Sequence, residues 1–378
     1  MKKLLTAFAM LLFVGGTLYA QPLWLRYNAI SPKGDKIAFT YMGNIYVVDA
    51  QGGMAKQITT TTSYDYNPVW SNDGSKIAFA SDRNGNCDVY VVGVEGGAAA
   101  RVTTNSTAEV PMAFSSDDKY IYYTASLQKN AENAQFAAAW MKELYKAPVT
   151  GGRPELVTTA TVCSVSFDKD GKSFLYYDRK GSENEWRKHQ VSSVARDLVY
   201  YDAKKNTHTI LTTNIGEDRD PRFVPGKNGE MVFLSERVND KCMNVFRGDY
   251  RNPQQAKQIT FFEKYPVRFL TVANDGTLCF GYQGEIYTQK VDGKPEKVKI
   301  DIVNDWQNVP ERGKFGRAGS IVMTPDGKQF AFVSRGEIFV TADEFTTTKQ
   351  ITNTAAAESS PSLAPDGRTL VYCSERDG

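Results

Sequence analysis

The residue types that most often carry out catalysis are sparse in this chain. His189 and His208 are its only two histidines, and they lie apart in the sequence. No H-E-x-x-H, G-x-S-x-G, Walker A or G-x-G-x-x-G motif is present. A Ser–His–Asp triad assembled across space stays open, but we expect His189 to form hydrogen bonds within a loop. We therefore assign no catalytic residue to this stretch.

Possible metal ligands are equally scattered. The segment Asp168-Lys-Asp170-Gly171 resembles the start of a calcium-binding loop, but its twelfth position is Arg179, where such a loop carries glutamate. A metal site needs several histidine, cysteine or carboxylate groups that converge, and two isolated histidines do not provide them. We predict a tight turn at Gly171, no metal ion and no cofactor.

The cysteines do not form a redox or zinc-binding pattern. An odd number leaves at least one thiol unpaired, and no pair has C-x-x-C spacing. Most fall in apolar, strand-like segments, where a free cysteine behaves as a small hydrophobic residue. We predict a structural role for all five, Cys87, Cys163, Cys242, Cys279 and Cys373.

The charge balance excludes one class of partner. The 378 residues contain 45 Lys and Arg against 43 Asp and Glu, a formal net charge of +2. Nucleic-acid binding requires clustered cations that neutralise several phosphates, and the sequence has no such cluster. We predict no nucleic-acid partner. The many aromatic residues and glycine-containing turns instead favour an all-β protein.

An internal repeat predicts the secondary-structure elements of the chain. Ile30-Ser-Pro-Lys-Gly-Asp-Lys-Ile-Ala-Phe39 returns as Trp70-Ser-Asn-Asp-Gly-Ser-Lys-Ile-Ala-Phe79, and further copies begin at Phe167, Met323 and Leu363. Looser copies surround 117–123, 229–233 and 276–280. The Asp-Gly pairs supply the positive φ of tight hairpin turns, and the flanking segments have the apolar pattern of buried strands.

Each repeat yields three or four antiparallel strands, too few to bury both faces of a sheet. Sheets of this size pack face to face around an axis, which predicts a β-propeller with about four strands per blade. Cys87 and Cys242 fall in corresponding hairpins of the second and fifth units, on opposite sides of a ring and too far apart for a disulfide. One aromatic position recurs in every unit, and we predict that it packs between blades: Phe39, Phe79, Tyr123, Tyr176, Phe233, Phe280 and Phe332.

The spacing of the repeats predicts the domain boundaries. Six units between about Leu25 and Gln307 indicate a six-bladed propeller over 21–307, followed by a Gly-rich, charged linker over 308–319. A seventh unit begins near 320 and an eighth near Ser359, so 320–378 is expected to be the start of a second propeller. The eighth unit stops in mid-hairpin, and we expect the chain to be truncated there. Two insertions interrupt the third and fourth units: 127–142, which could form a short helix or a loop, and 178–197, which contains Trp186 and His189. We expect both to be solvent-exposed or packing loops, although loops on one rim of a propeller often carry function.

The first 20 residues predict export. Lys2 and Lys3 precede an apolar stretch from Leu4 to Tyr19, and Ala20 provides a small residue before a cut at Gln21. This order is typical of a cleavable signal peptide, and it predicts a periplasmic or secreted protein. An uncleaved N-terminal anchor is the alternative, although the apolar run is shorter than the about 20 residues that span a bilayer comfortably.

On the basis of these residues, the chain resembles the tricorn protease family. It also resembles the wider class of TolB-like, WD40-like propellers. The turn-and-strand repeat is common to that whole class. The order of six units followed by a fresh start is more specific, as are the junction Phe262-Glu-Lys-Tyr-Pro-Val-Arg268 and the segment Gln329-Phe-Ala-Phe-Val-Ser-Arg-Gly336.

The resemblance implies a role in proteolysis. It implies a propeller that gates or channels peptides to a serine peptidase domain located downstream, together with a PDZ domain and possible homo-oligomers. No catalytic position of the family falls in this stretch, so none is transferred. Two alternatives remain: a non-enzymatic TolB-like scaffold that binds proteins, and the propeller of a prolyl-oligopeptidase-type enzyme.

Overall fold

The structure is a computed structural model that describes residues 22–127, 141–182, 184, 186–187, 191–237, 242–290, 292–303, 316–344 and 348–377. The predicted signal peptide, His189, most of the 127–142 insertion and most of the 308–319 linker lie outside the described residues. Within the described part, no helix has the length and apolar character needed to cross a bilayer. The described residues include a single short 3-10 helix, η2 (Pro253–Gln255).

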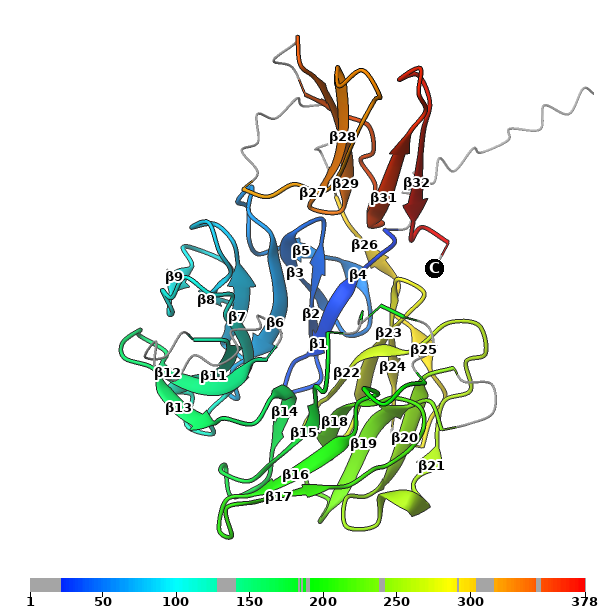
Figure 1. The fold of residues 1–378 in the computed structure, drawn as a ribbon. Helices are drawn as coiled ribbons and strands as arrows, with labels where there is room; N and C mark the ends of the chain where they lie inside the picture. Colours follow the sequence, from blue (N-terminus) through cyan, green and yellow to red (C-terminus); the bar gives the residue numbers. More distant parts are fainter. Residues whose placement is uncertain are drawn as a thin grey trace, which may run out of the picture.

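Six four-stranded antiparallel sheets follow one another along the described chain, each built from strands in sequence order, with only β4 skipped in the first (Figure 1). The first two comprise β1 (Arg26–Ile30), β2 (Lys36–Tyr41), β3 (Asn44–Asp49) and β5 (Lys56–Gln57), then β6 (Asp65–Trp70), β7 (Lys76–Ser81), β8 (Asp88–Gly93) and β9 (Ala100–Arg101). The third and fourth comprise β10 (Val110–Phe114), β11 (Tyr120–Ala125), β12 (Glu143–Pro148) and β13 (Glu155–Thr158), then β14 (Val162–Phe167), β15 (Phe174–Asp178), β16 (Leu198–Asp202) and β17 (Thr207–Ile210). The fifth and sixth comprise β18 (Asp218–Phe223), β19 (Glu230–Ser235), β20 (Asn244–Asp249) and β21 (Lys257–Gln258), then β22 (Arg268–Val272), β23 (Leu278–Tyr282), β24 (Glu285–Gln289) and β25 (Glu296–Lys297).

These six sheets close into a ring. The first strand of each sheet packs against the first strand of the next, and β22 of the sixth sheet returns to β1 of the first. A short parallel pair, β4 (Gly53–Met54) with β26 (Ile300–Asp301), joins the two ends of the ring. We call these six sheets and the β4–β26 pair the ring, and its first strands (β1, β6, β10, β14, β18 and β22) the inner strands.

Glycine is required at the closure of the ring. Gly52 has φ +93°, a conformation that residues with a Cβ rarely adopt. A Cβ built on Gly52 would lie 2.4 Å from the carbonyl oxygen of Lys299. The amide of the next residue, Gly53, donates a hydrogen bond of 2.8 Å to the same oxygen. The backbone of the first sheet can therefore approach the end of the sixth only where no side chain intervenes.

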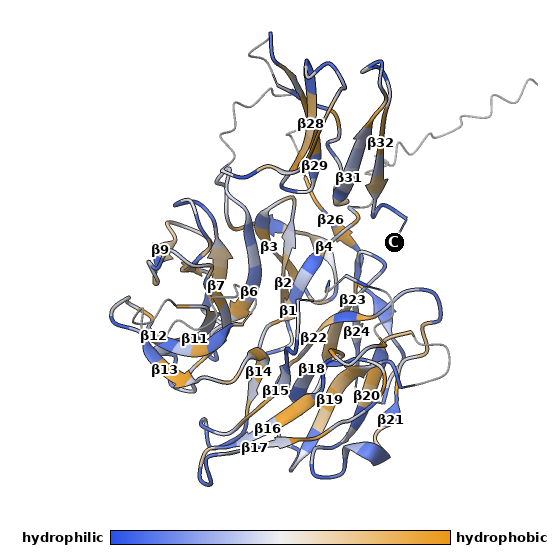
Figure 2. Ribbon diagram, in the orientation of Figure 1, coloured by the Kyte–Doolittle hydropathy of each residue, from blue (hydrophilic) through white to orange (hydrophobic). Residues whose placement is uncertain are grey.

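The core lies between neighbouring sheets. In the ring, the recurring aromatic position predicted from the repeat is buried, with Phe39, Phe79, Tyr123, Phe233 and Phe280 at 0% exposure. Figure 2 shows apolar residues concentrated along strands such as β19 and β20, with hydrophilic residues in the connecting loops. One member of the series departs from the prediction: Phe332 is only half-buried.

Phe332 belongs to the first of two further sheets that stand beyond the ring, at the top of Figure 1. The first comprises β27 (Gly319–Met323), β28 (Gln329–Ser334), β29 (Glu337–Ala342) and β30 (Lys349–Gln350), and the second comprises β31 (Glu358–Leu363) and β32 (Leu370–Ser374). We call them the 319–374 sheets. Their strands pack mainly on each other, and Arg335 reaches the ring at Ser63, so one face of the sheet that carries Phe332 has no neighbouring sheet to cover it.

The inner strands share an irregularity that the repeat did not predict. Each is interrupted by a β-bulge, and in most of them one bulge residue has positive φ: Tyr27, Asn67, Ser164, Asp220 and Phe269. In the third sheet Pro111 occupies the corresponding place, and the register shift there spans a single residue. Proline cannot adopt positive φ, which explains why this bulge differs from the others.

The fold class is confirmed: the described residues form an all-β, propeller-like arrangement of four-stranded sheets, with two further sheets after the ring. The boundaries at 307 and 319 remain predictions, because 304–315 lie outside the described residues.

Candidate functional site

The axis of the ring contains a cavity of about 580 Å³. Residues from the inner strands of all six sheets line it, so no single sheet could form it alone. We call it the axial cavity. The bulges turn side chains such as Asn67, Ser164 and Asp220 toward the axis, because an extra residue changes the alternation of side chains along a strand.

The two ends of the axial cavity differ. At one end its wall includes Asn72 and Asn274, two exposed residues that follow inner strands. At the other end the wall consists of half-buried aromatic residues, with Tyr27 lying 5.5 Å from Tyr66 and 5.0 Å from Phe269 between ring centroids. The first end is polar and open to solvent, whereas the second is narrowed by aromatic rings.

Trp186 covers the aromatic end. It belongs to the 178–197 insertion of the fourth sheet, yet its ring lies 6.4 Å from that of Tyr27 and 5.9 Å from that of Phe269, in the first and sixth sheets. Its backbone carbonyl accepts a hydrogen bond of 3.0 Å from Nη2 of Arg268. The insertion therefore reaches across the end of the ring and contacts the sheets on the opposite side.

Two guanidinium groups hold the Trp186 indole. Arg26 lies 4.8 Å and Arg268 lies 5.1 Å from the centre of the ring, distances at which cation–π attraction is favourable. Burial, with the nearby charge of Arg219, lowers the pKa of Arg268 to about 10. Arg26 also forms an ion pair with Glu375, which follows β32. The covered end of the cavity is thus in direct contact with the 319–374 sheets.

The wall opposite the first sheet is cationic. Four cationic side chains and one carboxylate, that of Asp220, face the axial cavity among its described lining residues; the cations are Lys142, Arg179, Arg219 and Arg222. Arg219 has Glu217 within 3.9 Å. Arg222 instead donates hydrogen bonds to neutral oxygens, of 2.6 Å to Oγ of Ser164 and 3.1 Å to the carbonyl of Pro221. Burial lowers its pKa.

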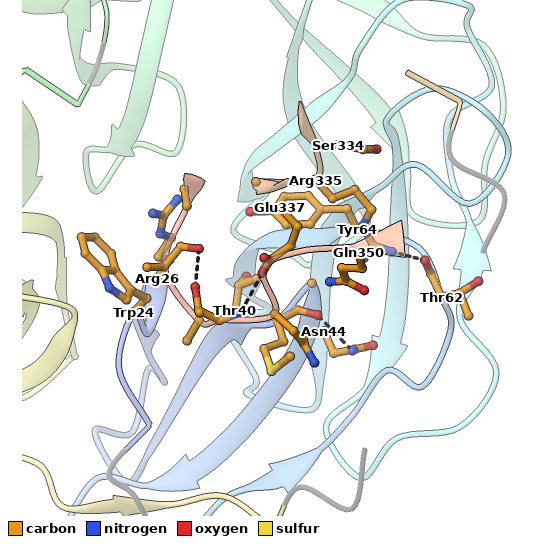
Figure 3. A pocket seen from close by; sticks show the side chains of 18 of the residues that line it. Trp24, Arg26, Thr40, Asn44, Thr62, Tyr64, Ser334, Arg335, Glu337 and Gln350 are labelled. Atoms are coloured by element: carbon orange, nitrogen blue, oxygen red, sulfur yellow. Dashed lines mark hydrogen bonds between the residues drawn. The ribbon is translucent and has the colours of Figure 1, made fainter. Parts of the chain in front are cut away.

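A second cavity of about 530 Å³ lies between the first sheet and the 319–374 sheets (Figure 3). Arg335 spans it, donating a hydrogen bond of 2.9 Å to the carbonyl of Ser63 and a shorter one to that of Thr62. Burial raises the pKa of Glu337, which also lines the cavity, to about 7. This cavity is an interface between the two groups of sheets, and its described lining residues include no histidine or cysteine.

The histidines and the turn at Gly171 do not approach a catalytic arrangement in the described residues. His208 lies in the outer strand β17, where its Nδ1 is 2.9 Å from the hydroxyl of Tyr176 and its ring packs 4.7 Å from that of Tyr201. The carboxylate of Asp170 accepts hydrogen bonds from the amides of Lys172 and Ser173 within the tight turn. No cluster of three or more metal-binding side chains occurs among the described residues.

The five cysteines are all present as free thiols. Cys163 lines the axial cavity, and Cys279 is buried beside Asn28, where burial raises the thiol pKa to about 12. The Sγ of Cys242 donates to the carbonyl of Tyr265 at 2.7 Å. A thiol with a raised pKa is a poor nucleophile, so the geometry of Cys279 favours packing over chemistry.

Sequence reasoning missed the residues around the axis, although a signal for them exists. Tyr27, Asn67, Ser164 and Phe269 each stand seven residues before the turn glycine of their repeat. Their residue types have nothing in common, so a search for catalytic motifs passes over them. The fixed offset from the turn glycine would have identified the bulge positions and hence part of the cavity wall.

Comparisons with known proteins extend these observations. The family model described as the tricorn protease N-terminal beta propeller domain matches residues 22–295. The crystal structure of the tricorn protease aligns with a TM-score of 0.62 and 19% identity, covering 89% of this chain and 32% of that one. The structure of a putative TolB from Agrobacterium tumefaciens aligns with a TM-score of 0.50 and 19% identity, covering 64% of this chain and 83% of that one. None of the curated protein sequences compared with the chain matches it.

At these identities the two structures show a likeness of fold. The chain spans about a third of the length of the tricorn protease structure that it matches.

Proposed function

The chain belongs to the family of tricorn protease N-terminal β-propeller domains, and from that premise we propose that it is the propeller portion of an exported, tricorn-like serine peptidase. In this proposal the ring gates or channels peptides, and hydrolysis takes place in a catalytic domain elsewhere in the full-length protein. No residue of this stretch is assigned a catalytic role.

The axial cavity is the observation that carries the proposal. Its volume of about 580 Å³ falls in the range of about 300–1,000 Å³ that is usual for ligand sites. Its two ends differ, one solvent-exposed at Asn72 and Asn274 and the other covered by Trp186. An enclosed path with one open and one covered end suits the admission or release of short extended peptides.

A substitution that fills the axial cavity tests this role. Met112 lines the cavity at the bulge of the third sheet, and Met112→Trp would add bulk toward the axis. Met54→Trp is the matched control, because Met54 is 56% exposed on the outside of the ring. In the full-length protein we expect Met112→Trp to slow hydrolysis of an oligopeptide several-fold and Met54→Trp to leave the rate unchanged. Equal rates for the two variants would overturn the role of the cavity.

A fluorophosphonate probe, which reacts with activated serines, tests the peptidase part of the proposal separately. We expect the full-length protein to be labelled at a serine outside residues 22–377, because no described serine of this stretch lies beside a histidine and a carboxylate in a triad. Labelling within 22–377 would contradict the assignment. Absence of both labelling and peptide hydrolysis would favour the non-enzymatic scaffold.

Export is proposed from the N-terminal sequence. Mass spectrometry of the protein recovered from its natural host should find a mature N-terminus at or near Gln21 in a periplasmic or secreted fraction. Recovery of an intact Met1 from the cytoplasmic fraction would contradict export.

A further inference from the structure

A third cavity, of about 290 Å³, lies beside Trp186. Glu375, which follows β32, is part of its lining, so the cavity lies where the ring meets the 319–374 sheets. Aromatic side chains from three separate parts of the chain also line it: Trp24, Trp186, Tyr265, Phe269 and Tyr282. We call this cavity the aromatic pocket.

The two indoles of the aromatic pocket are held in place without a ligand. The guanidinium of Arg26 lies 5.1 Å from the centre of the Trp24 ring and 4.8 Å from that of Trp186, so it links the two (Figure 3 labels Trp24 and Arg26). The amide of Leu25 donates a hydrogen bond of 2.9 Å to the carbonyl of Gly284, which fixes the segment that carries Trp24 on the sixth sheet. A pocket with ordered walls avoids the cost of ordering them when a ligand binds.

The segment 262–268, singled out in the sequence, supplies another part of the lining. Its Tyr265 lies 6.2 Å from Tyr282 between ring centroids, and its hydroxyl donates a hydrogen bond of 2.6 Å to the carbonyl of Asp377. Tyr282 in turn stacks at 4.0 Å on Phe262. These two tyrosines are therefore also positioned by contacts of their own, and both remain half-buried, so that a ligand can reach them.

The aromatic pocket adjoins the covered end of the axial cavity. A small cavity of about 30 Å³ shares Trp186 and Phe269 with the aromatic pocket, and Tyr27 and Phe269 with the axial cavity. Phe269, on the inner strand β22, thus lines all three spaces. The aromatic pocket lies on the outer side of the rings that narrow the axis, where a peptide that enters or leaves by this end would pass.

The size and chemistry of the aromatic pocket favour one kind of ligand group. Its volume of about 290 Å³ is at the lower end of the range of about 300–1,000 Å³ for ligand sites, so it suits one large side chain. Burial of apolar area against the rings is favourable, and contacts between rings add to it for an aromatic group. The charged residues of its described lining are Arg26 and Arg268 against Glu375, so a lysine or arginine ligand would add a third cation.

We propose that the aromatic pocket binds one aromatic side chain of a peptide at the covered end of the axial cavity. This inference rests on the proposed function, since it names the side chain that the ring would recognise in the peptides that it passes. A peptide held in this way has the neighbouring residues of its chain at the rings of Trp186 and Phe269. Peptides with a small or cationic side chain at that place are disfavoured.

Binding of short peptides to the full-length protein tests the inference. The protein is first treated with the fluorophosphonate probe, so that an activated serine cannot hydrolyse the peptides. Four N-acetylated pentaalanine amides, with phenylalanine, leucine, alanine or lysine at the central position, serve as ligands in isothermal titration. We expect the phenylalanine peptide to bind about tenfold or more tightly than the alanine peptide. The leucine peptide should lie between them, and the lysine peptide should bind most weakly.

The variants assign the preference to the aromatic pocket. Tyr265→Ala removes a ring of the lining and should lower the ratio of phenylalanine to alanine affinity several-fold, whereas Tyr265→Phe keeps the ring and should keep the ratio. Tyr120→Ala is the matched control, because Tyr120 is also half-buried and also lies beside a lysine, but does not line the pocket. Trp186→Ala repeats the test from the 178–197 insertion if Tyr265→Ala does not fold.

Two results overturn the inference. The first is equal binding of the phenylalanine peptide and either the leucine or the alanine peptide, and the second is an aromatic preference that survives both Tyr265→Ala and Trp186→Ala. Neither result bears on peptide hydrolysis by the full-length protein, so the proposed function would stand or fall on the Met112→Trp and fluorophosphonate experiments. Conversely, aromatic binding that depends on Tyr265 in a protein without peptidase activity would keep this site and remove the proposed function.

Discussion

Phe79 in the ring and Phe332 in the 319–374 sheets occupy the same place in the same repeat. Each stacks on the aromatic residue opposite it in the next strand, at 6.0 Å from Tyr90 and 5.7 Å from Phe339. Phe79 is nevertheless fully buried, whereas Phe332 is half-buried. A single sheet thus establishes the cross-strand pair, but burial of the pair requires a second sheet on each side.

The exposed apolar residues repeat this contrast. Ile321, Met323 and Val371 in the 319–374 sheets are at least 60% exposed, whereas the inner strands of the ring bury residues such as Ile30, Val110 and Val162. A closed ring gives every sheet two neighbours, and two isolated sheets give each other one. Four substitution experiments, in order of decreasing expected loss of stability, test this difference between the ring and the 319–374 sheets.

The largest loss of stability, and the largest difference between the two groups of sheets, is expected from the matched pair Phe79→Ala and Phe332→Ala. Truncating a fully buried phenylalanine leaves a cavity between two sheets and costs about 3–5 kcal/mol. Truncating the half-buried Phe332 should cost about 1–2 kcal/mol, since less apolar area returns to water. Hydrogen exchange of the amides in β7 and β28 would measure the two losses separately.

Phe261→Ala serves as the control for this pair, because Phe261 is 75% exposed and its loss should change stability by less than about 0.5 kcal/mol. Equal costs at Phe79 and Phe332 would mean that neighbouring sheets contribute nothing to the burial of this position.

A smaller effect is expected at the closure of the ring. Gly52→Ala and Gly53→Ala both place a Cβ on a residue with positive φ, which costs about 1 kcal/mol in each case. Only at Gly52 does the new Cβ meet the carbonyl of Lys299, whereas nothing lies within 4 Å of it at Gly53. Denaturant unfolding should show a further loss of about 1–3 kcal/mol for Gly52→Ala alone. Equal losses in the two variants would show that closure at β4–β26 adds no stability.

The pH dependence of the 319–374 sheets should follow Glu337. Burial raises the pKa of its carboxyl from 4.5 to about 7, with repulsion from Glu358 acting in the same direction. Between these values the folded state binds more protons than the unfolded state, so stability is fully present below about pH 4.5, falls as the pH rises through 7, and is constant above. Because the group is partly exposed, the loss should be about 1 kcal/mol.

Glu337→Gln should flatten this profile, measured by hydrogen exchange in β29 at pH 5 and pH 8. The exposed Glu344 provides the control variant Glu344→Gln, which should keep the wild-type slope. A wild-type profile that rises with pH over this window would contradict the assignment.

The smallest effect is expected where the two groups of sheets meet. Arg335→Ala removes the hydrogen bonds to the carbonyls of Thr62 and Ser63, which are worth about 1 kcal/mol in total at a partly exposed site. Limited proteolysis should then cut the 319–374 sheets several-fold faster while the ring resists as before. Arg368→Ala, at an exposed turn of the same sheets, should leave the cleavage rate unchanged. Faster cleavage of the ring in Arg335→Ala would show that the two groups of sheets unfold together.

The sheets were largely predictable from the sequence, because local chemistry specifies them. Turn glycines such as Gly34 and Gly74 have the positive φ that their hairpins require, and the aromatic series is buried throughout the ring. The predicted resemblance to the tricorn protease family is confirmed by the match over residues 22–295. The exposure of Phe332 was not predictable, because the repeat specifies a sheet and not the number of its neighbours.

The candidate site was not predictable in the same way. Arg222 is an ordinary residue of a strand until the bulge at Asp220 and the closure of the ring place it at the axis. Trp186 lies in an insertion, and its contacts with Tyr27 and Phe269 join sheets that are distant in the sequence. The positions of both residues depend on the assembled ring, and no local sequence pattern specifies the geometry of that ring.

Photo-crosslinking tests most directly whether peptides occupy the axial cavity. A short peptide that carries a central benzoylphenylalanine would be irradiated with the full chain, and its adducts located by mass spectrometry. We predict adducts on inner-strand residues that line the cavity, such as Val69, Met112 and Val165, and their loss when excess unlabelled peptide competes. Adducts confined to the outer strands or to the 319–374 sheets would contradict the account.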